Sequence, residues 1–337
     1  MIQSPIFLVG SPRSGTSLLR QMMDRHPRLA ICDETHFFRL MFLGRRAGAF
    51  GDLKDAANRK RLVDQYVALR PTQKLGMDCA GLAERLYREA TSYPAMFAAV
   101  LNYYAESQGK PRCGEKTPRH ALVVDKLCEW FPDAVIVHIL RDPRDSVASR
   151  IRMPFGSPSP IINARVWLKY NLAARWAINR PGYIEVRYER LVAQPEEELT
   201  RICEFVGEKF SPSMLASEKA AVEHSSGRDR YRTPLTAGRM GQWRKELSER
   251  QVAQIEWVVG PHLESFGYAR EVPAASLATI ASGLGYAAFD FLRQNVPKLP
   301  AALWHQVVKP GEIAGYERSV RTRVWADDEE VSGAPLR

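Results

Sequence analysis

The stretch from Pro5 to His26 constrains the fold of this chain more than any other. It begins with an uninterrupted apolar run, Ile6 to Val9, of the kind that forms a strand buried on both faces. A turn rich in glycine, serine and proline follows over residues 10–15, and apolar residues then recur at helical spacing. A strand, a glycine-rich turn and a helix in this order leave backbone N–H groups and a helix N-terminus directed at one point. The stretch therefore predicts an anion-binding site.

The turn has the spacing G-x4-G followed by two hydroxyl residues, as in loops that hold nucleotide phosphates. Loops that bind nucleoside triphosphates carry a lysine directly after the second glycine, where this chain has a threonine. The positive charge of Arg13 lies inside the loop instead, so the loop suits one terminal phosphate better than a γ-phosphate. The residues predicted to bind phosphate oxygens are Arg13, Ser14, Gly15, Thr16 and Ser17.

The composition narrows the class of protein. The chain has 337 residues, of which 45% are hydrophobic, as in a soluble protein of one large domain or one domain with appendages. Its net charge of +10 favours anionic ligands or surfaces, but no basic run is interleaved with aromatic residues, so we expect no nucleic-acid partner. The five cysteines form no C-x-x-C pair, and no spacing of ligand residues indicates a metal site. With no basic leader before the first apolar run, we expect a reduced, cytoplasmic protein.

Acidic residues follow a second predicted strand over residues 27–32. Because the carboxyl ends of parallel strands line the ligand crevice, Glu34 and His36 should lie near the phosphate loop. Asp33 is better interpreted as a cap or first-turn acid of a helix over residues 37–46. Helical spacing over residues 52–107 predicts a helical insertion, of about residues 36–110, before the third strand.

The third and fourth predicted strands also end in charged residues. The third ends at Glu115 and Lys116, before a helix predicted over residues 118–131. The fourth, residues 134–140, ends in Arg141.

A helix should start just beyond the fourth strand, which puts Ser149 two helical turns after Arg141, and these two residues predict a second anion site. A rival interpretation makes Asp142 the magnesium ligand of a nucleotide hydrolase, which the missing loop lysine disfavours. The neighbouring Arg144 and Asp145 are interpreted as a surface pair.

Three segments resemble the sulfotransferases that use 3′-phosphoadenosine-5′-phosphosulfate: PRSGTSLL in the loop, RDPRDSVAS after the fourth strand, and the later VRYERL. The resemblance spans about residues 5–268, and PRSGTSLLRQMMDRHP with CDETHFF is most similar to the protein-tyrosine sulfotransferases. It implies a three-layer α/β/α fold with a central, mostly parallel sheet. It also implies in-line transfer of a sulfuryl group to a hydroxyl acceptor without a metal, leaving adenosine 3′,5′-bisphosphate.

The resemblance assigns roles to single residues. Glu34 matches the general base, and Lys116 and Arg13 match the groups that stabilise charge on the leaving phosphate. His36 stands where the protein-tyrosine enzymes have an arginine, so the resemblance does not assign His36 the role of that arginine in acceptor binding.

Further matches concern the nucleotide. Arg141 and Ser149 match the residues that hold the 3′-phosphate, and Tyr188 matches an aromatic residue that packs on the adenine. A basic loop that ends near G-x-W closes over the 3′-phosphate in this family, which makes Arg239 and Gly241 the candidates here.

Two other functions remain possible: a phosphate-loop kinase that uses Mg-ATP, and a non-catalytic nucleotide-binding scaffold. The missing loop lysine disfavours the first, and Glu34 with Lys116 disfavours the second. The acceptor could be a small molecule, a glycan, a lipid or a peptide hydroxyl.

We expect a sulfotransferase domain over residues 1–272, followed by a helical extension and loose tail over 273–337. The apolar residues within 274–304 predict a helix that either packs on the protein or lies on a membrane surface, in which case the protein would be peripheral to the membrane. The same segment could instead contact a second copy in a homodimer.

Overall fold

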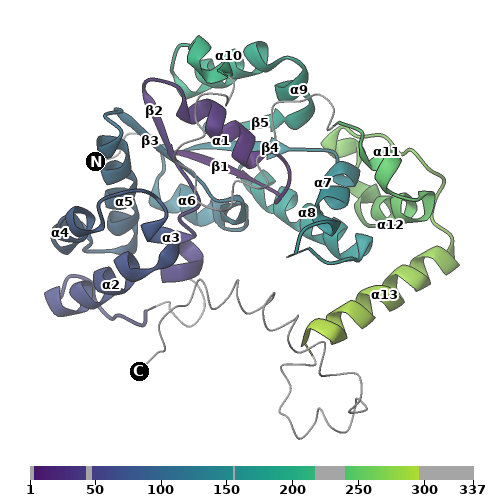
Figure 1. Ribbon diagram of the computed structural model, residues 1–337, viewed down its shortest axis with the longest axis horizontal. Coiled ribbons are helices and arrows are strands. Elements are labelled where there is room, and N and C mark those ends of the chain that lie inside the picture. Colours follow the sequence, from purple (N-terminus) through teal and green to yellow (C-terminus); the bar gives the residue numbers. More distant parts are fainter. Residues whose placement is uncertain (1–3, 43–47, 155, 217–239, 296–337) are drawn as a thin grey trace, which may run out of the picture. The chain divides into compact units, whose positions relative to one another are not determined.

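The computed structural model describes residues 4–42, 48–154, 156–216 and 240–295. Five strands of this part form one sheet in the order β2-β3-β1-β4-β5, and every neighbouring pair is parallel (Figure 1). They are β1 (Ile6–Gly10), β2 (Leu29–Cys32), β3 (Arg112–Lys116), β4 (Val135–Leu140) and β5 (Tyr183–Arg187). The predicted α/β fold with a central parallel sheet is confirmed.

The order of the strands defines where a ligand can bind. The chain passes from β1 to β2, returns through β3, and continues on the other side of β1 with β4 and β5. β1 is therefore the point at which the strand order reverses, and parallel α/β sheets bind ligands there, beyond the carboxyl ends of the strands. Right-handed crossovers place α1 (Thr16–Asp24) on one face, and α5 (Tyr93–Ser107) and α6 (Val124–Trp130) on the other.

The predicted helical insertion between the second and third strands is present. Its described residues form a π-helix and four α-helices: η1 (Phe38–Phe42), α2 (Ala56–Ala68), α3 (Arg70–Gln73), α4 (Cys79–Glu89) and α5. Three of these helices begin where a short polar side chain accepts a backbone N–H of the first turn, at Asp55, Asp78 and Ser92.

Two predicted helices differ from expectation. The segment after the second strand forms the π-helix η1, and residues 43–47 lie outside the described part. The helix predicted over 118–131 is divided into a 3-10 helix, η3 (Pro118–Val123), and α6, because the backbone of Val123 is not helical (φ −137°, ψ 30°).

The chain forms two compact units. The first comprises residues up to 141 and 170–239 and holds the whole sheet, with α9 (Tyr188–Ala193) and α10 (Pro195–Val206). The second comprises residues 142–169 and those from 240 onwards, with α7 (Pro143–Ile151), α11 (Trp243–Glu246), α12 (Glu249–Val259) and α13 (Leu277–Asn295). Helix α8 (Pro160–Ala174) includes the boundary between them. The division at residue 272 remains a prediction.

Arg144 and Asp145 do not form the predicted surface pair, since both are buried in the second unit. The guanidinium of Arg144 pairs with Glu256 at 2.8 Å and lies over the ring of Trp243 at 4.8 Å. Asp145 accepts the backbone N–H groups of Gly241 and Trp243 at 2.8 and 3.0 Å. The surface-pair prediction was wrong because these partners come from much later in the chain, where no local pattern reveals them.

The apolar segment predicted for a surface contact forms α13 as far as residue 295, and the rest of 274–304 lies outside the described part. Helix α13 packs within its own unit through Gly283, where a Cβ atom would come within 2.5 Å of the Ile161 side chain and 2.7 Å of Gln254. Among the described residues, no helix combines the length and apolar character needed to cross a membrane.

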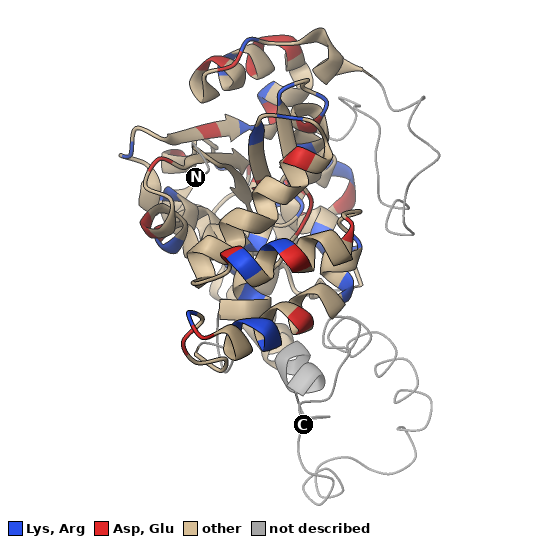
Figure 2. Cartoon of the chain, turned by 90° about the vertical axis from the view of Figure 1, so that its left-hand side faces the viewer, with Lys and Arg blue, Asp and Glu red and all other residues tan. Residues whose placement is uncertain are grey.

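Charges of both signs are mixed on the surface. Figure 2 shows acidic residues beside basic ones on the helices that face the viewer. Ion pairs one helical turn apart among the described residues include Lys60 with Asp64 at 2.7 Å and Arg85 with Glu89 at 3.2 Å. The positive net charge is therefore not gathered into one basic stripe on this face.

We expect His138 on β4 to make the stability of the fold depend on pH. The side chain is fully buried between Tyr183 Oη, 2.6 Å from Nδ1, and Asn171 Oδ1, 2.9 Å from Nε2. Burial lowers the pKa of His138, although the charge of Glu185 opposes this. Below about pH 6.5 the unfolded chain therefore binds a proton that the folded protein excludes.

We expect the free energy of unfolding to fall as the pH is lowered from 7.5 to 5.5. His138 should contribute up to about 1.4 kcal/mol per pH unit between its unfolded and folded pKa values. Urea denaturation at both pH values measures the loss, which should be smaller in His138→Gln. Identical losses in the two proteins would assign the pH dependence to other groups.

Candidate active site

The predicted site residues of the first unit lie along one edge of the sheet. In the sheet register, Leu8 of β1 lies beside Lys116 of β3, and Leu140 of β4 lies beside Arg187 of β5. Residues at or just beyond the carboxyl ends of the five strands are thereby brought together. They are the loop residues Arg13 to Ser17, Glu34, Lys116, Arg141 and Tyr188.

The loop after β1 has the geometry of an anion cradle. Arg13 and Gly15 have positive φ values of 74° and 95°, which turn successive backbone N–H groups toward one side. No described side chain caps α1 at Gly15, and the first intrahelical bond is donated by Leu19, so the first N–H groups of α1 have no intrahelical partner. The hydroxyl of Ser14 is buried and has no hydrogen-bond partner among the described residues. These residues fit a bound phosphate group.

Arg141 and Tyr188 pack against this loop. The guanidinium of Arg141 lies 4.3 Å from the centre of the Tyr188 ring and donates a hydrogen bond to the carbonyl of Arg13 at 3.3 Å. A Cβ atom at position 15 would come within 2.4 Å of the Tyr188 ring, so the loop needs glycine there both for its backbone angle and for this contact. Arg141 covers part of the Tyr188 ring, and adenine packing on Tyr188 remains a prediction.

Lys116 is buried and joins two acidic residues that follow β2. Its Nζ lies 2.8 Å from Glu34 Oε1 and 2.7 Å from Asp33 Oδ1. Burial alone would lower the pKa of Lys116, but the charges of Glu34 and Asp33 outweigh it and raise the pKa. The side chain of Asp33 is 56% exposed, so its partial loss of hydration raises the pKa only against the larger effect of Lys116, which holds the pKa of Asp33 well below its usual range. Asp33 is therefore part of this charged group, and its interpretation as a helix cap was wrong.

His36 holds the second oxygen of Glu34, with Nε2 lying 3.3 Å from Oε2. Burial lowers the pKa of His36, and the nearby charge of Glu34 opposes this shift. The backbone of His36 has a φ of 50°, in the left-handed region that few residues other than glycine adopt. Glu34 therefore has the Lys116 ammonium beside one carboxylate oxygen and the His36 ring near the other.

Two predicted nucleotide contacts belong to the second unit, and a third is not among the described residues. Ser149 is buried in α7 of the second unit. Gly241 also belongs to that unit, where it has a φ of 66° and donates its N–H to Asp145. Arg239 lies outside the described residues. The roles of these three residues in binding the 3′-phosphate remain predictions.

Asp142, the magnesium ligand of the rival interpretation, caps α7. Its carboxylate accepts the backbone N–H of Arg144 at 2.8 Å and pairs with the guanidinium of the same residue at 2.8 Å. These contacts give the carboxylate a structural role that needs no metal ion.

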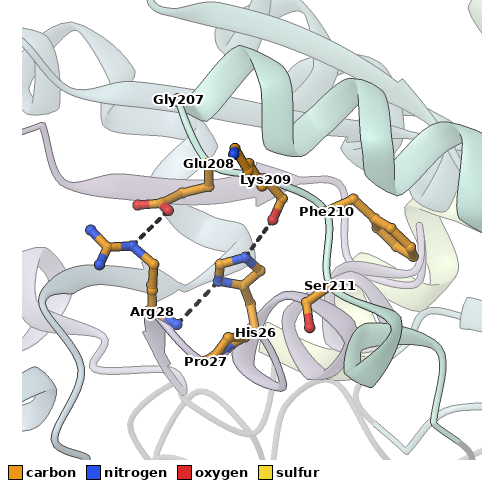
Figure 3. A pocket seen from close by; sticks show the side chains of 8 residues that line it. All are labelled: His26, Pro27, Arg28, Gly207, Glu208, Lys209, Phe210 and Ser211. Atoms are coloured by element: carbon orange, nitrogen blue, oxygen red, sulfur yellow. Dashed lines mark hydrogen bonds and ion pairs between the residues drawn. The ribbon is translucent and has the colours of Figure 1, made fainter.

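A separate pocket lies where the chain enters β2, at the amino edge of the sheet (Figure 3). His26 accepts the N–H of Arg28 at Nδ1 and donates from Nε2 to the Lys209 carbonyl at 2.8 Å, while Arg28 pairs with Glu208. The lining residues are His26, Pro27, Arg28, Gly207, Glu208, Lys209, Phe210 and Ser211. This edge is opposite to the one that carries the charged group, so the pocket is not part of the candidate active site.

A parallel sheet with a glycine-rich loop after its first strand is typical of proteins with a phosphate-loop fold, and comparison with known proteins identifies the family. The sequence profile of the sulfotransferase family matches residues 5–212, and that of the sulfotransferase domain matches residues 165–267. The protein therefore belongs to the sulfotransferase family, as the sequence motifs predicted, and is a transferase of sulfuryl groups.

Individual relatives agree. Protein-tyrosine sulfotransferase A of Caenorhabditis elegans is 26% identical over 285 residues, which cover 78% of this chain and 67% of that protein. Nodulation protein NoeE of Sinorhizobium fredii is 26% identical over 309 residues, covering 81% and 68%. The sulfotransferase domain of the Synechococcus PCC 7002 olefin synthase is similar in structure, with a TM-score of 0.52 and 22% identity over 85% of this chain and 96% of that one. The last likeness shows the shared phosphate-loop fold.

Proposed function

We propose that this sulfotransferase takes its sulfuryl group from 3′-phosphoadenosine-5′-phosphosulfate and transfers it in line to a hydroxyl acceptor, with Glu34 as general base. One observation carries the proposal: Glu34 and Lys116 lie 2.8 Å apart at the sheet edge that also carries the phosphate loop. A base for the acceptor and a cation for the leaving group are thus neighbours beside an anion cradle.

Each residue has a chemical task in this reaction. The bound donor supplies a sulfuryl group on a phosphate leaving group, on which negative charge grows during transfer, by analogy with phosphoryl transfer. Arg13, the Ser14 hydroxyl and the loop N–H groups hold that phosphate and stabilise its charge. Lys116 supplies a buried positive charge next to the loop. Glu34 takes the proton of the acceptor hydroxyl, a step typically worth about 10²–10⁴ in rate.

The remaining predicted residues serve the nucleotide. Arg141 offers a planar guanidinium suited to the 3′-phosphate, and we assign it that phosphate together with Ser149. Tyr188 is proposed for the adenine, and Arg239 with Gly241 for the closing side of the 3′-phosphate site.

The acceptor is proposed to be a hydroxyl compound. Some relatives are named protein-tyrosine sulfotransferases, so a peptide tyrosine is the first acceptor to test. Sugar, lipid and small alcohol or phenol hydroxyls have the same reacting atom and belong in the same panel.

Two measurements test the proposal. Calorimetry should show tight binding of adenosine 3′,5′-bisphosphate, equal with and without Mg²⁺, and weaker binding of ATP. Donor carrying radioactive sulfur should then pass its label to a member of a panel that contains a tyrosyl peptide, a glycan, an aliphatic alcohol and a phenol. Preference for Mg-ATP would favour a kinase, and bisphosphate binding without any consumption of the donor would favour a scaffold.

A further inference from the structure

Glu115 is an unusual residue for the interior of this sheet. It directly precedes Lys116 on β3, and because successive side chains of a strand point to opposite faces, it points away from the charged group. Its side chain is completely buried. A buried carboxylate is costly unless hydrogen bonds compensate for its lost hydration, so its partners indicate its role.

Three consecutive backbone N–H groups are linked to this carboxylate by hydrogen bonds, one directly and two through a hydroxyl group. Thr35 donates its N–H to Glu115 Oε1 at 3.1 Å and its hydroxyl to the same atom at 2.9 Å. The N–H of His36 donates to the hydroxyl of Thr117 at 3.4 Å, and that hydroxyl donates to Glu115. The N–H of Phe37 donates to the hydroxyl of Thr35 at 3.2 Å. The turn directly after Glu34, including the left-handed residue, thus forms around one oxygen atom.

His120 holds the other oxygen. Its Nδ1 lies 3.0 Å from Glu115 Oε2, and its ring packs edge-on against Phe38 with centroids 5.2 Å apart. Burial alone would raise the pKa of Glu115, but His120 and the hydroxyl bonds hold it below its usual value. The carboxylate therefore stays ionised near neutral pH, and consecutive N–H groups in such a turn are suited to bind an anion.

We propose that Glu115 is a positioning residue for sulfuryl transfer: it is the internal anion around which the turn after Glu34 forms, and it thereby sets the distance from Glu34 to Lys116. The inference rests on the proposed role of Glu34 as base. Glu115 and Lys116 are adjacent in the chain, so one short segment supplies both the anchor of the turn and the charged partner of the base.

Glu115→Gln tests the inference, because it keeps the size and one acceptor oxygen but removes the charge. We expect turnover to fall about 10- to 100-fold, since displacements near 1 Å have effects of this size. The dissociation constant of adenosine 3′,5′-bisphosphate should stay within about twofold, because the phosphate loop is untouched. Turnover is followed as bisphosphate released from the donor, with the best acceptor of the panel, or with water when none reacts.

Glu198→Gln is the matched control. Glu198 is also fully buried and charge-paired, with Arg201 and Arg190, but it lies on α10. Both variants should lose stability, and only Glu115→Gln should lose turnover when both are assayed well below their melting temperatures. Equal turnover in the two variants would overturn the inference.

A second pair of variants keeps the test decisive if Glu115→Gln does not fold. Thr35→Val removes one hydroxyl bond to Glu115 and should slow turnover, whereas Thr35→Ser keeps the hydroxyl and should restore it. A fast Thr35→Val would contradict the positioning role. Glu34→Gln, assayed in the same series, separates the proposed base from the proposed positioning residue. Full activity of Glu34→Gln would show that Glu34 is not the base. A slow Glu34→Gln together with a fast Glu115→Gln would overturn only the positioning role of Glu115.

Discussion

Replacing Glu34 with glutamine is expected to slow turnover by about 10²–10⁴-fold, the usual contribution of a general base. The amide has nearly the same size, but it cannot take the acceptor proton. Binding of adenosine 3′,5′-bisphosphate should not weaken, because the substitution removes a negative charge near an anion site. Turnover from donor consumption and affinity from calorimetry, measured on the same preparation, check both parts.

Asp33→Asn is the control for this prediction. Both acids pair with Lys116 at nearly the same distance, 2.7 and 2.8 Å, so either substitution takes one negative charge from that lysine. The side chain of Asp33 is 56% exposed and has no proposed part in proton transfer, so its loss should slow turnover far less. Equal turnover in wild type and Glu34→Gln, or an equal loss in Asp33→Asn, would remove Glu34 from the role of base.

Arg141→Ala is expected to have the opposite effect to Glu34→Gln: it should weaken nucleotide binding more than it slows turnover. Hydrogen bonds to charged groups are worth about 1.5–3 kcal/mol, which corresponds to a loss of about 10- to 150-fold in affinity for adenosine 3′,5′-bisphosphate. Loss of the contacts with Tyr188 and the Arg13 carbonyl would add to this effect. Turnover at saturating donor should change less than affinity, because Glu34 and Lys116 remain.

Two controls isolate the 3′-phosphate in this prediction. Adenosine 5′-phosphate lacks that group, so Arg141→Ala should weaken its binding much less than that of the bisphosphate. Arg28→Ala removes the same charge at the opposite edge of the sheet and should leave both affinities unchanged. If Arg141→Ala weakened the two nucleotides equally, the arginine would act on the loop rather than on the 3′-phosphate.

Much of the fold and site was predictable because its signals are local. The apolar run before the glycine turn, and the charged residues at the ends of later strands, identify parallel strands whose ends meet at one edge. That reasoning alone places Glu34 and Lys116 near the loop, and the structure gives the distance of 2.8 Å.

Other features depend on register and on distant partners. In the sequence, Asp33 has the position of a helix cap. Only the pairing of β2 with β3 shows that it lies beside Lys116. Glu115 has no sequence signal beyond its place before Lys116, although strand alternation assigns it to the other face. Arg144 and Asp145 look like a solvated pair because their partners in the second unit are remote in sequence.

The left-handed backbone at His36 is a conformational cost located two residues after the proposed base, Glu34. A residue with a side chain costs roughly 1–2 kcal/mol in that conformation, whereas glycine adopts it freely. His36→Gly relieves this backbone cost, but it also removes a side chain that is only 18% exposed, so the change in melting temperature measures which of the two effects is larger. Turnover should fall, because Glu34 loses the imidazole near its second oxygen. Thermal melts and turnover assays of this variant measure both quantities. Selection for stability alone would act on the backbone and the packing of this residue, whereas selection for activity acts on its imidazole.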